Sequence, residues 1–265
     1  MNLNHPKIKV ISSGKYVPET LITNEDLERL VETSDEWITT RTGIKTRHRA
    51  VDEKTSDMAV KAAQKAIDRV NYDVSKIDLI IVASITGDQM TPSTANFVQA
   101  KLGIHHEAMS FDINAACTGF VYGLEVAANM LQSNRFRAAL VIGAEMLTSV
   151  VDYTDRNTCV LFGDGAGAMI IEPSPVEQHQ AFFFNASKGD TNDILTVVSK
   201  IKMDGKKVYQ FAIDAMNQAI SRVLSDAKLD ISDIDMIIPH QANERIIQSV
   251  SKTMGIPMDK FMLNL

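Results

Sequence analysis

Two stretches of the chain match each other: residues 73–81 read DVSKIDLII and residues 230–238 read DISDIDMII. Each follows a segment, 56–70 or 208–227, in which apolar residues recur at three- and four-residue spacing, the pattern of a helix with one apolar face. Each also precedes a second helical stretch that ends at a glycine, Gly103 or Gly255, and glycine favours the left-handed conformation that closes a helix. The repeat therefore predicts two similar α/β halves.

The repeated strand indicates how the halves are layered. Residues 78–84 (DLIIVAS) form a continuous apolar run without alternation, which is typical of a strand covered by helices on both faces. The first half continues with an expected strand at 108–113, a helix beginning near Cys117, a strand at 138–144, and paired strands at 159–162 and 166–171. The glycine-rich run 163–167 lacks the spacing of a phosphate loop, so we expect a tight turn between those strands.

The repeat also predicts the domain organisation. We expect an N-terminal half at 1–172, a linker region at 173–207 and a C-terminal half at 208–265. Aligned on the two glycines, the second copy is shorter than the first by about 54 residues. We therefore expect the second half to be incomplete.

Composition excludes several classes of protein. The 265 residues are 45% hydrophobic and 23% charged, which excludes collagen-like, disordered and disulfide-framework proteins. A net charge of −6 argues against bulk nucleic acid as the main partner. The two cysteines have no CxxC spacing, which favours neither a zinc site nor a disulfide, and no signal peptide or membrane span is predicted. We expect a cytoplasmic protein that binds no metal, membrane or nucleic acid.

Cys117 is the sharpest candidate for chemistry. It follows an apolar strand and two alanines and precedes a helical pattern, so the helix dipole is expected to favour its thiolate and lower its pKa. The alternative is a small buried residue, because free cysteine is often buried. For Cys159, in the apolar run TCVLF, we favour structural burial.

His240 and Trp37 are weaker candidates on their own. His240 closes the second-half strand at its carboxyl end, where open α/β sheets place ligands, although most single histidines are structural. Cys117 and His240 come from different halves, as a composite site requires. Trp37 and Arg41 share one helix face and can stack on a base and hold a phosphate, but a partly buried tryptophan beside a solvated arginine is the simpler interpretation.

Four segments together resemble a known family. TSDEWITTRTGI (33–44), AACTGF (115–120), DRNTCVLFGDGAGA (155–168) and IPHQANERI (238–246) look like those of the β-ketoacyl-acyl-carrier-protein synthase III family. The resemblance runs along the whole chain, with the motifs in the family's order. It implies a thiolase-like α/β fold with two similar halves.

The resemblance also implies roles for particular residues. Cys117 is the acylated nucleophile, and His240 is one of two groups that bind the thioester oxygen. The coenzyme A (CoA) site is expected to use Thr33, Trp37, Arg41 and Arg156. The acidic carrier protein is expected to meet Gln241, Ala242, Asn243, Glu244 and Arg245. The acyl pocket is expected to include Leu147, Phe162 and Met90, the last of these reaching across a homodimer interface.

The implied reaction is a decarboxylative condensation of an acyl-CoA primer with malonyl-acyl-carrier protein, which starts type II fatty acid synthesis. It needs no cofactor, since the CoA thioester is a substrate. The family's second enolate donor is an asparagine in a Tyr-Gly-Asn-Thr segment, which we expect to be missing from the second half. One alternative is a condensing enzyme that makes a specialised metabolite from CoA thioesters. Another is a non-catalytic partner that binds CoA or carrier protein.

Overall fold

The computed structural model describes residues 5–265, which divide into two compact units. The first unit holds residues up to Thr20, His48–Leu147 and Asp164–Phe183, and the second holds Leu21–Arg47, Thr148–Gly163 and Phe184–Leu265. Each unit is thus built from separate parts of the chain. The boundaries expected from the repeat, 1–172, 173–207 and 208–265, stay a prediction.

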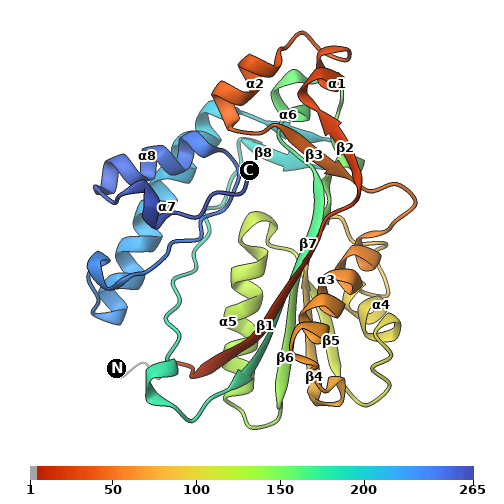
Figure 1. Cartoon of the computed structure of the whole chain (residues 1–265), viewed down its shortest axis with the longest axis vertical. Helices are drawn as coiled ribbons and strands as arrows, with labels where there is room; N and C mark the ends of the chain where they lie inside the picture. Colours follow the sequence, from red (N-terminus) through yellow and green to blue (C-terminus); the bar gives the residue numbers. More distant parts are fainter. Residues whose placement is uncertain (1–4) are drawn as a thin grey trace. The chain divides into compact units, whose positions relative to one another are not determined.

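A five-stranded mixed sheet forms the centre of the first unit, with the order β1-β7-β6-β4-β5 (Figure 1). Strand β4 is parallel to β5 and β6, whereas β7 is antiparallel to β6 and β1. The strands are β1 (Ile8–Tyr16), β4 (Ile77–Ala83), β5 (Met109–Ile113), β6 (Ala138–Met146) and β7 (Asp164–Pro173).

Helices cover both faces of this sheet, as the unbroken apolar run in β4 predicts (Figure 1). Helices α3 (Thr55–Val70) and α4 (Thr94–Lys101) lie on one face and α5 (Gly119–Leu131) on the other. Successive β4 side chains enter two different cores: Ile80 and Val82 pack on the α3 side, and Leu79 and Ile81 pack on the α5 side. All four are fully buried, each worth about 1.5–3 kcal/mol relative to exposure.

The second unit contains helices α1 (Asn24–Glu28), α2 (Asp35–Thr42), α6 (Arg156–Cys159), α7 (Gly205–Ala227) and α8 (Glu244–Met254). Strands β8 (Leu195–Val197) and β9 (Ile201–Met203) form a hairpin. The first two of the points at which the chain passes from one unit to the other lie in the paired strands β2 (Thr20–Thr23) and β3 (Thr46–Arg49). Helices α7 and α8 pack through an apolar core that includes Ile213, Ile247 and Phe261.

The repeat is confirmed in the conformations of its helix ends. Helices α3 and α7 each end at a left-handed residue, Asn71 (φ 49°) and Lys228 (φ 57°). The helices after each repeated strand segment close at Gly103 (φ 69°) and Gly255 (φ 67°). The aspartate that begins each repeat starts a 3₁₀ turn in both copies.

Three expectations about local structure are wrong. Residues 159–162 form the end of helix α6 and the turn after it instead of a strand. The Asp155 side chain accepts hydrogen bonds from the backbone N–H of Asn157 and the hydroxyl of Thr158, and so caps a helix that runs from Arg156 to Cys159. The stretch 164–167 begins strand β7 instead of a turn, because β1 and β6 pair with it on both sides. The second-half strand has a single parallel bridge, Ile237 to Phe261, because only one short segment pairs with it.

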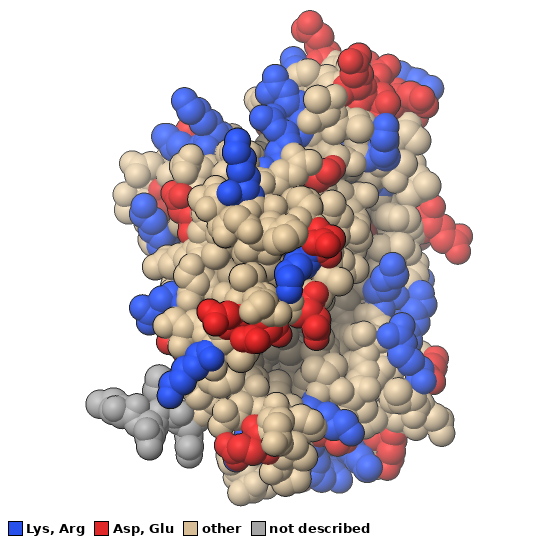
Figure 2. Space-filling view, turned by 60° about the vertical axis from the view of Figure 1, so that its left-hand side comes forward, with Lys and Arg blue, Asp and Glu red and all other residues tan. Residues whose placement is uncertain are grey.

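Among residues 5–265, none of the helices combines the length and apolar character that a membrane crossing requires. Lys, Arg, Asp and Glu side chains are interspersed on the face drawn in Figure 2, without a continuous basic surface there. This distribution agrees with the net charge of −6.

Candidate functional site

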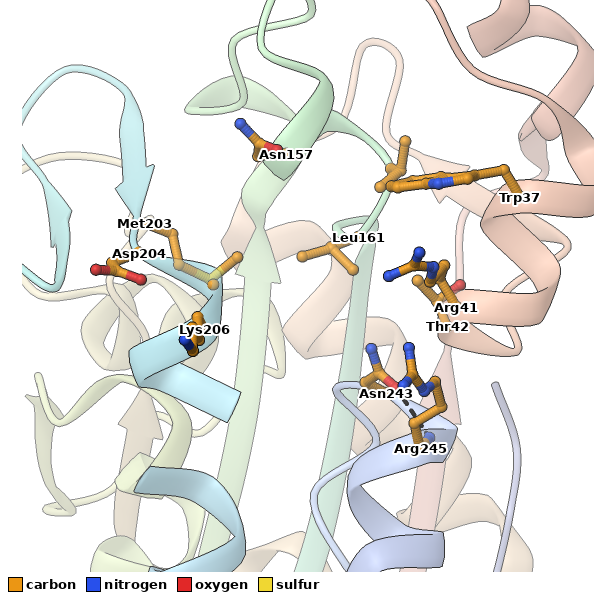
Figure 3. Close-up of a pocket in the computed structure, with 12 residues that line it drawn as sticks. Trp37, Arg41, Thr42, Asn157, Leu161, Met203, Asp204, Lys206, Asn243 and Arg245 are labelled. Atoms are coloured by element: carbon orange, nitrogen blue, oxygen red, sulfur yellow. Dashed lines mark hydrogen bonds between the residues drawn. The ribbon is translucent and has the colours of Figure 1, made fainter. Parts of the chain in front are cut away.

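A pocket of about 480 Å³ lies within the second unit (Figure 3). Its walls come from α2, from the segment at α6, from the turn that joins β9 to α7, and from the start of α8. The lining residues are Trp37, Arg41, Thr42, Asn157, Val160, Leu161, Met203, Asp204, Gly205, Lys206, Asn243 and Arg245. Segments far apart in the sequence therefore meet around one cavity.

An aromatic ring in contact with two arginines forms one side of this pocket. The guanidinium carbon of Arg156 lies 4.2 Å from the centroid of the Trp37 ring, and that of Arg41 lies 5.7 Å from it. The Ser34 hydroxyl caps α2 by accepting a hydrogen bond from the Trp37 backbone N–H at 3.1 Å, which fixes the start of the helix. Trp37 and Arg41 share one face of α2, as their spacing predicts. Trp37 is half-buried and Arg41 is exposed, which also agrees with the simpler interpretation, so their role in binding a ligand stays a prediction.

The pocket carries excess positive charge. Arg41, Arg245 and Lys206 all line the pocket, and in Figure 3 the two arginines are drawn on one side of it and Lys206 on the other. None of these three cations, nor Arg156, forms an ion pair with a carboxylate within the described part of the chain, residues 5–265. The pocket carboxylate Asp204 pairs with Lys207 at 3.2 Å. An anionic ligand with a planar ring fits this environment.

Cys117 lies in the first unit, in a 3₁₀ turn that directly precedes α5. The helix begins at Gly119, two residues later than the position that the sequence suggested. Ala116 has a left-handed conformation (φ 45°), which costs a non-glycine residue about 1–2 kcal/mol, and the Cys117 side chain is exposed. The turn thus presents the sulfur at the carboxyl end of β5 at the expense of local strain.

The expected fall in the pKa of Cys117 is wrong. Protein atoms around the sulfur displace water and raise the pKa of the thiol, and the carboxylate of Glu145 raises it further. The Cys117 backbone N–H acts in the opposite direction but does not prevail. The resting group is therefore a thiol at neutral pH.

Glu145, at the end of β6, is a residue that the sequence analysis missed. Burial raises the pKa of its carboxyl group, although hydrogen bonds from the loop after β4 oppose this shift. The carboxylate accepts hydrogen bonds from the backbone N–H of Ile85 at 2.8 Å and from the hydroxyl of Thr86. A single acid at the end of the apolar run ALVIGAE was the available sequence signal.

His240 lies in the second unit, three residues after the Ile237 bridge. The surrounding protein lowers the pKa of its imidazole through desolvation, so the ring is neutral at pH 7. The next residue, Gln241, connects two segments: its amide donates to the carbonyl oxygens of Pro239 and Met262, both at 3.0 Å. This pairing fixes the backbone on which the imidazole is carried.

The structure brings some of the predicted residues together. Trp37, Arg41, Asn243 and Arg245 line one pocket, with Arg156 stacked on the tryptophan. Asn243 caps α8, its side-chain oxygen accepting from the Arg245 backbone N–H at 2.9 Å (Figure 3).

Other predicted residues lie elsewhere. Thr33 directly precedes the Ser34 cap of α2, and its buried hydroxyl has no hydrogen-bond partner among residues 5–265. Ala242 packs against the core of α7 and α8, and Glu244 is the first residue of α8. The remaining candidates divide between the units: Cys117, Met90 and Leu147 in the first, and His240 and Phe162 in the second. The composite site of Cys117 and His240 stays a prediction.

Comparisons with known proteins agree along nearly the whole chain. Residues 111–190 match the family model described as 3-oxoacyl-[acyl-carrier-protein (ACP)] synthase III, and residues 224–265 match the model of its C-terminal part. The beta-ketoacyl-[acyl-carrier-protein] synthase III of Acholeplasma laidlawii is 55% identical over 259 residues, which cover 97% of this chain and 84% of that protein. The one of Clostridium acetobutylicum is 44% identical over 274 residues, with the same two coverages of 97% and 84%.

Solved structures show the same similarity. The crystal structure of 3-oxoacyl-[acyl-carrier-protein] synthase III from Aquifex aeolicus matches with a TM-score of 0.91 at 40% identity, covering 97% of this chain and 84% of that one. The predicted fold class, an α/β thiolase-like fold, is confirmed.

Proposed function

Because the chain belongs to the β-ketoacyl-[acyl-carrier-protein] synthase III family, we propose that it condenses an acyl-CoA primer with malonyl-acyl-carrier protein to start type II fatty acid synthesis. The observation that best supports this is the pocket in which Trp37 is stacked with arginines beside cations that have no carboxylate partner in the described chain. CoA presents an adenine ring and several phosphate charges to such a surface. The names of the relatives favour a carrier-protein substrate over the two alternatives.

In the first half-reaction, Cys117 accepts the acyl group. Its sulfur attacks the thioester carbonyl, a new carbon–sulfur bond forms, the bond to CoA breaks, and the proton of the thiol leaves with the CoA thiol. Because the pKa of Cys117 is raised, this proton is removed as the substrate reacts and not beforehand. The covalent step divides one difficult carbon–carbon bond formation into two easier steps.

In the second half-reaction, the malonyl group loses CO₂ and leaves an enolate, whose carbon attacks the acylated Cys117 and releases the thiolate. We assign His240 as a donor to the enolate oxygen. Its lowered pKa fits this role, because a neutral imidazole donates a hydrogen bond through one nitrogen without having to lose a charge afterwards. One such donor is worth about 2.7–4 kcal/mol in comparable sites.

The family also suggests partners. We assign the stretch Gln241–Arg245, where Arg245 is exposed, to the acidic carrier protein. Met90 is fully exposed at 101% and is proposed to reach the acyl pocket of a second copy in a homodimer, with Leu147 and Phe162 as further pocket residues. A cytoplasmic location is part of the same proposal.

The test is acylation of the whole chain by acetyl-CoA, followed by mass spectrometry of peptides. We expect an acetyl adduct on Cys117, its loss in Cys117→Ala, and its retention in the matched control Cys159→Ala, because Cys159 is only 1% exposed. Release of the adduct as 3-oxobutanoyl-carrier protein after addition of malonyl-carrier protein completes the test. An adduct on another residue, or CoA binding without any adduct, contradicts the proposal, and turnover with malonyl-CoA in place of the carrier favours the specialised-metabolite alternative.

A further inference from the structure

A buried arginine lies in the second unit close to the aromatic pocket. Arg47, in β3, is only 4% exposed. Its Nε donates a hydrogen bond to the carbonyl oxygen of Val160 at 3.1 Å, and its two terminal nitrogens donate to the same carbonyl and to the Asn24 side-chain oxygen. Burial lowers the pKa of Arg47 to about 10, so the guanidinium still carries its charge at neutral pH.

Asn24 extends this connection to α2. It is 2% exposed, and its Nδ2 donates to Oδ1 of Asp35 at 2.7 Å and to the carbonyl oxygen of Ile44 at 3.0 Å. The same nitrogen lies 3.3 Å from the Thr39 hydroxyl. Asp35 and Thr39 are one helical turn apart on α2, so Asn24 holds the first turn of that helix.

The hydrogen bonds of Arg47 and Asn24 connect helix α6 with helix α2. These two helices carry the stacked pair, Arg156 on α6 and Trp37 on α2. Val160 is the residue that closes α6, whose first residue is Arg156. Asp35 is the first residue of α2, and Trp37 follows it by two positions. The two helices are therefore joined twice. Hydrogen bonds through Arg47 and Asn24 join Val160 at the end of α6 to the start of α2. The 4.2 Å stacking contact joins Arg156 of α6 to Trp37 of α2.

This stacking contact leaves no room for a base between the two groups. A planar ring inserted between the indole and the guanidinium needs roughly 7 Å, twice the carbon contact distance of about 3.5 Å. The gap can open by movement of the Arg156 side chain alone or by separation of α6 from α2. Separation breaks the bonds that Arg47 makes and leaves a charged group and a carbonyl oxygen buried without partners, which is strongly unfavourable.

We propose that Arg47 is a positioning residue for the nucleotide end of the CoA substrate: with Asn24 it fixes the spacing of α2 and α6, so that the stacked pair opens through the Arg156 side chain only. This rests on the proposed function. An apolar residue would fill the space of Arg47 without joining Val160 to Asn24, and a lysine would not form the planar fork that reaches both. The specific requirement is therefore the guanidinium, not merely a filled core.

The test compares a thioester that carries the nucleotide with one that lacks it. Arg47→Met and Arg47→Lys are measured with CoA, by titration of the fluorescence of Trp37, the only tryptophan of the chain, and by Cys117 acylation from acetyl-CoA and from acetyl-N-acetylcysteamine. For Arg47→Met we expect about tenfold weaker CoA binding and an equal loss of acylation by acetyl-CoA, below the hundredfold that misplacement far from the chemistry can cause. Acylation by the small thioester, which has no adenine, stays within about twofold of wild type.

The matched control is Lys45→Met. Lys45 also contacts Asp35, at 3.6 Å, but from the exposed side and without reaching α6, so CoA binding is expected to stay unchanged. Equal losses with both thioesters mean that Arg47 has only a structural role, and unchanged CoA binding in Arg47→Met also overturns the proposal. If Arg47→Met does not fold, Arg47→Lys is judged by the same two comparisons. A wild-type chain that acquires no acetyl group from acetyl-CoA instead refutes the proposed function itself.

Discussion

Replacement of Lys206 by methionine tests whether the pocket binds phosphate groups. Lys206 lines the pocket of the second unit and has no carboxylate partner among residues 5–265, so its charge is available to a ligand. Methionine keeps an unbranched side chain and removes only the charge. The adjacent Lys207 provides a matched control, because it pairs with Asp204 at 3.2 Å and is not among the pocket residues.

The expected magnitude follows from the exposure of the side chain. Two unit charges about 4 Å apart in water attract by about 1 kcal/mol, and Lys206 is exposed enough for the aqueous value to apply. Loss of that attraction weakens CoA binding about fivefold. Salt screens exposed charges, so the effect should be clear at about 0.1 M salt and largely vanish at about 1 M.

Calorimetric titration of CoA and of pantetheine, which lacks the nucleotide and its phosphates, provides the measurement. We expect Lys206→Met to weaken CoA binding at low salt, to leave pantetheine binding unchanged, and to exceed the effect of Lys207→Met. An equal loss for pantetheine, a loss that does not depend on salt, or equal effects of the two lysine variants would refute the assignment of Lys206 to phosphate binding.

Three further predictions concern the packing and the titrating groups. Gly14→Ala should lower the free energy of unfolding by about 3 kcal/mol in urea titrations, because the added Cβ would lie 2.3 Å from a backbone oxygen of α3. The matched control Gly167→Ala should be tolerated, because no atom lies within 4 Å of the position of its added Cβ. Glu145→Gln should lower the pKa of Cys117, shifting the pH profile of iodoacetamide alkylation to lower pH; an unshifted profile contradicts the assigned repulsion. Folding lowers the pKa of His240 from its usual 6.5, so the unfolded chain binds a proton on this imidazole at a higher pH than the folded chain does. The free energy of unfolding, measured in urea between about pH 7 and pH 5, should therefore fall more for wild type than for His240→Gln.

The sequence predicts the parts of the fold that depend on local pattern. The repeat with its closing residues Gly103 and Gly255, the doubly covered strand β4, and the shared helix face of Trp37 and Arg41 all follow from residue spacing and are confirmed. Helix periodicity and glycine conformation are properties of short segments, so no distant partner is needed to read them.

The parts that sequence reasoning misses depend on contacts between distant segments. Residues 164–167 look like a turn, but β1 and β6 bind them on both sides, and β1 is about 150 residues away in the chain. Arg47 reads as one more charge in the basic stretch 45–49, and only the fold shows that it is buried against Val160. Buried polar contacts of this kind have no periodicity that a sequence pattern can reveal.

The same difference between local and distant effects explains the state of Cys117. A helix terminus stabilises a nearby negative charge by about 0.3–1 kcal/mol when exposed, and the position of Cys117 before α5 led to the expectation of a thiolate. Desolvation and the Glu145 carboxylate come from the tertiary structure, act in the opposite direction and prevail. An unperturbed cysteine is only a few per cent thiolate at pH 7, so the fraction here is smaller still. The Cys117 thiol should therefore react slowly with small electrophiles, and the acyl transfer that we propose relies on a substrate that binding already holds in place.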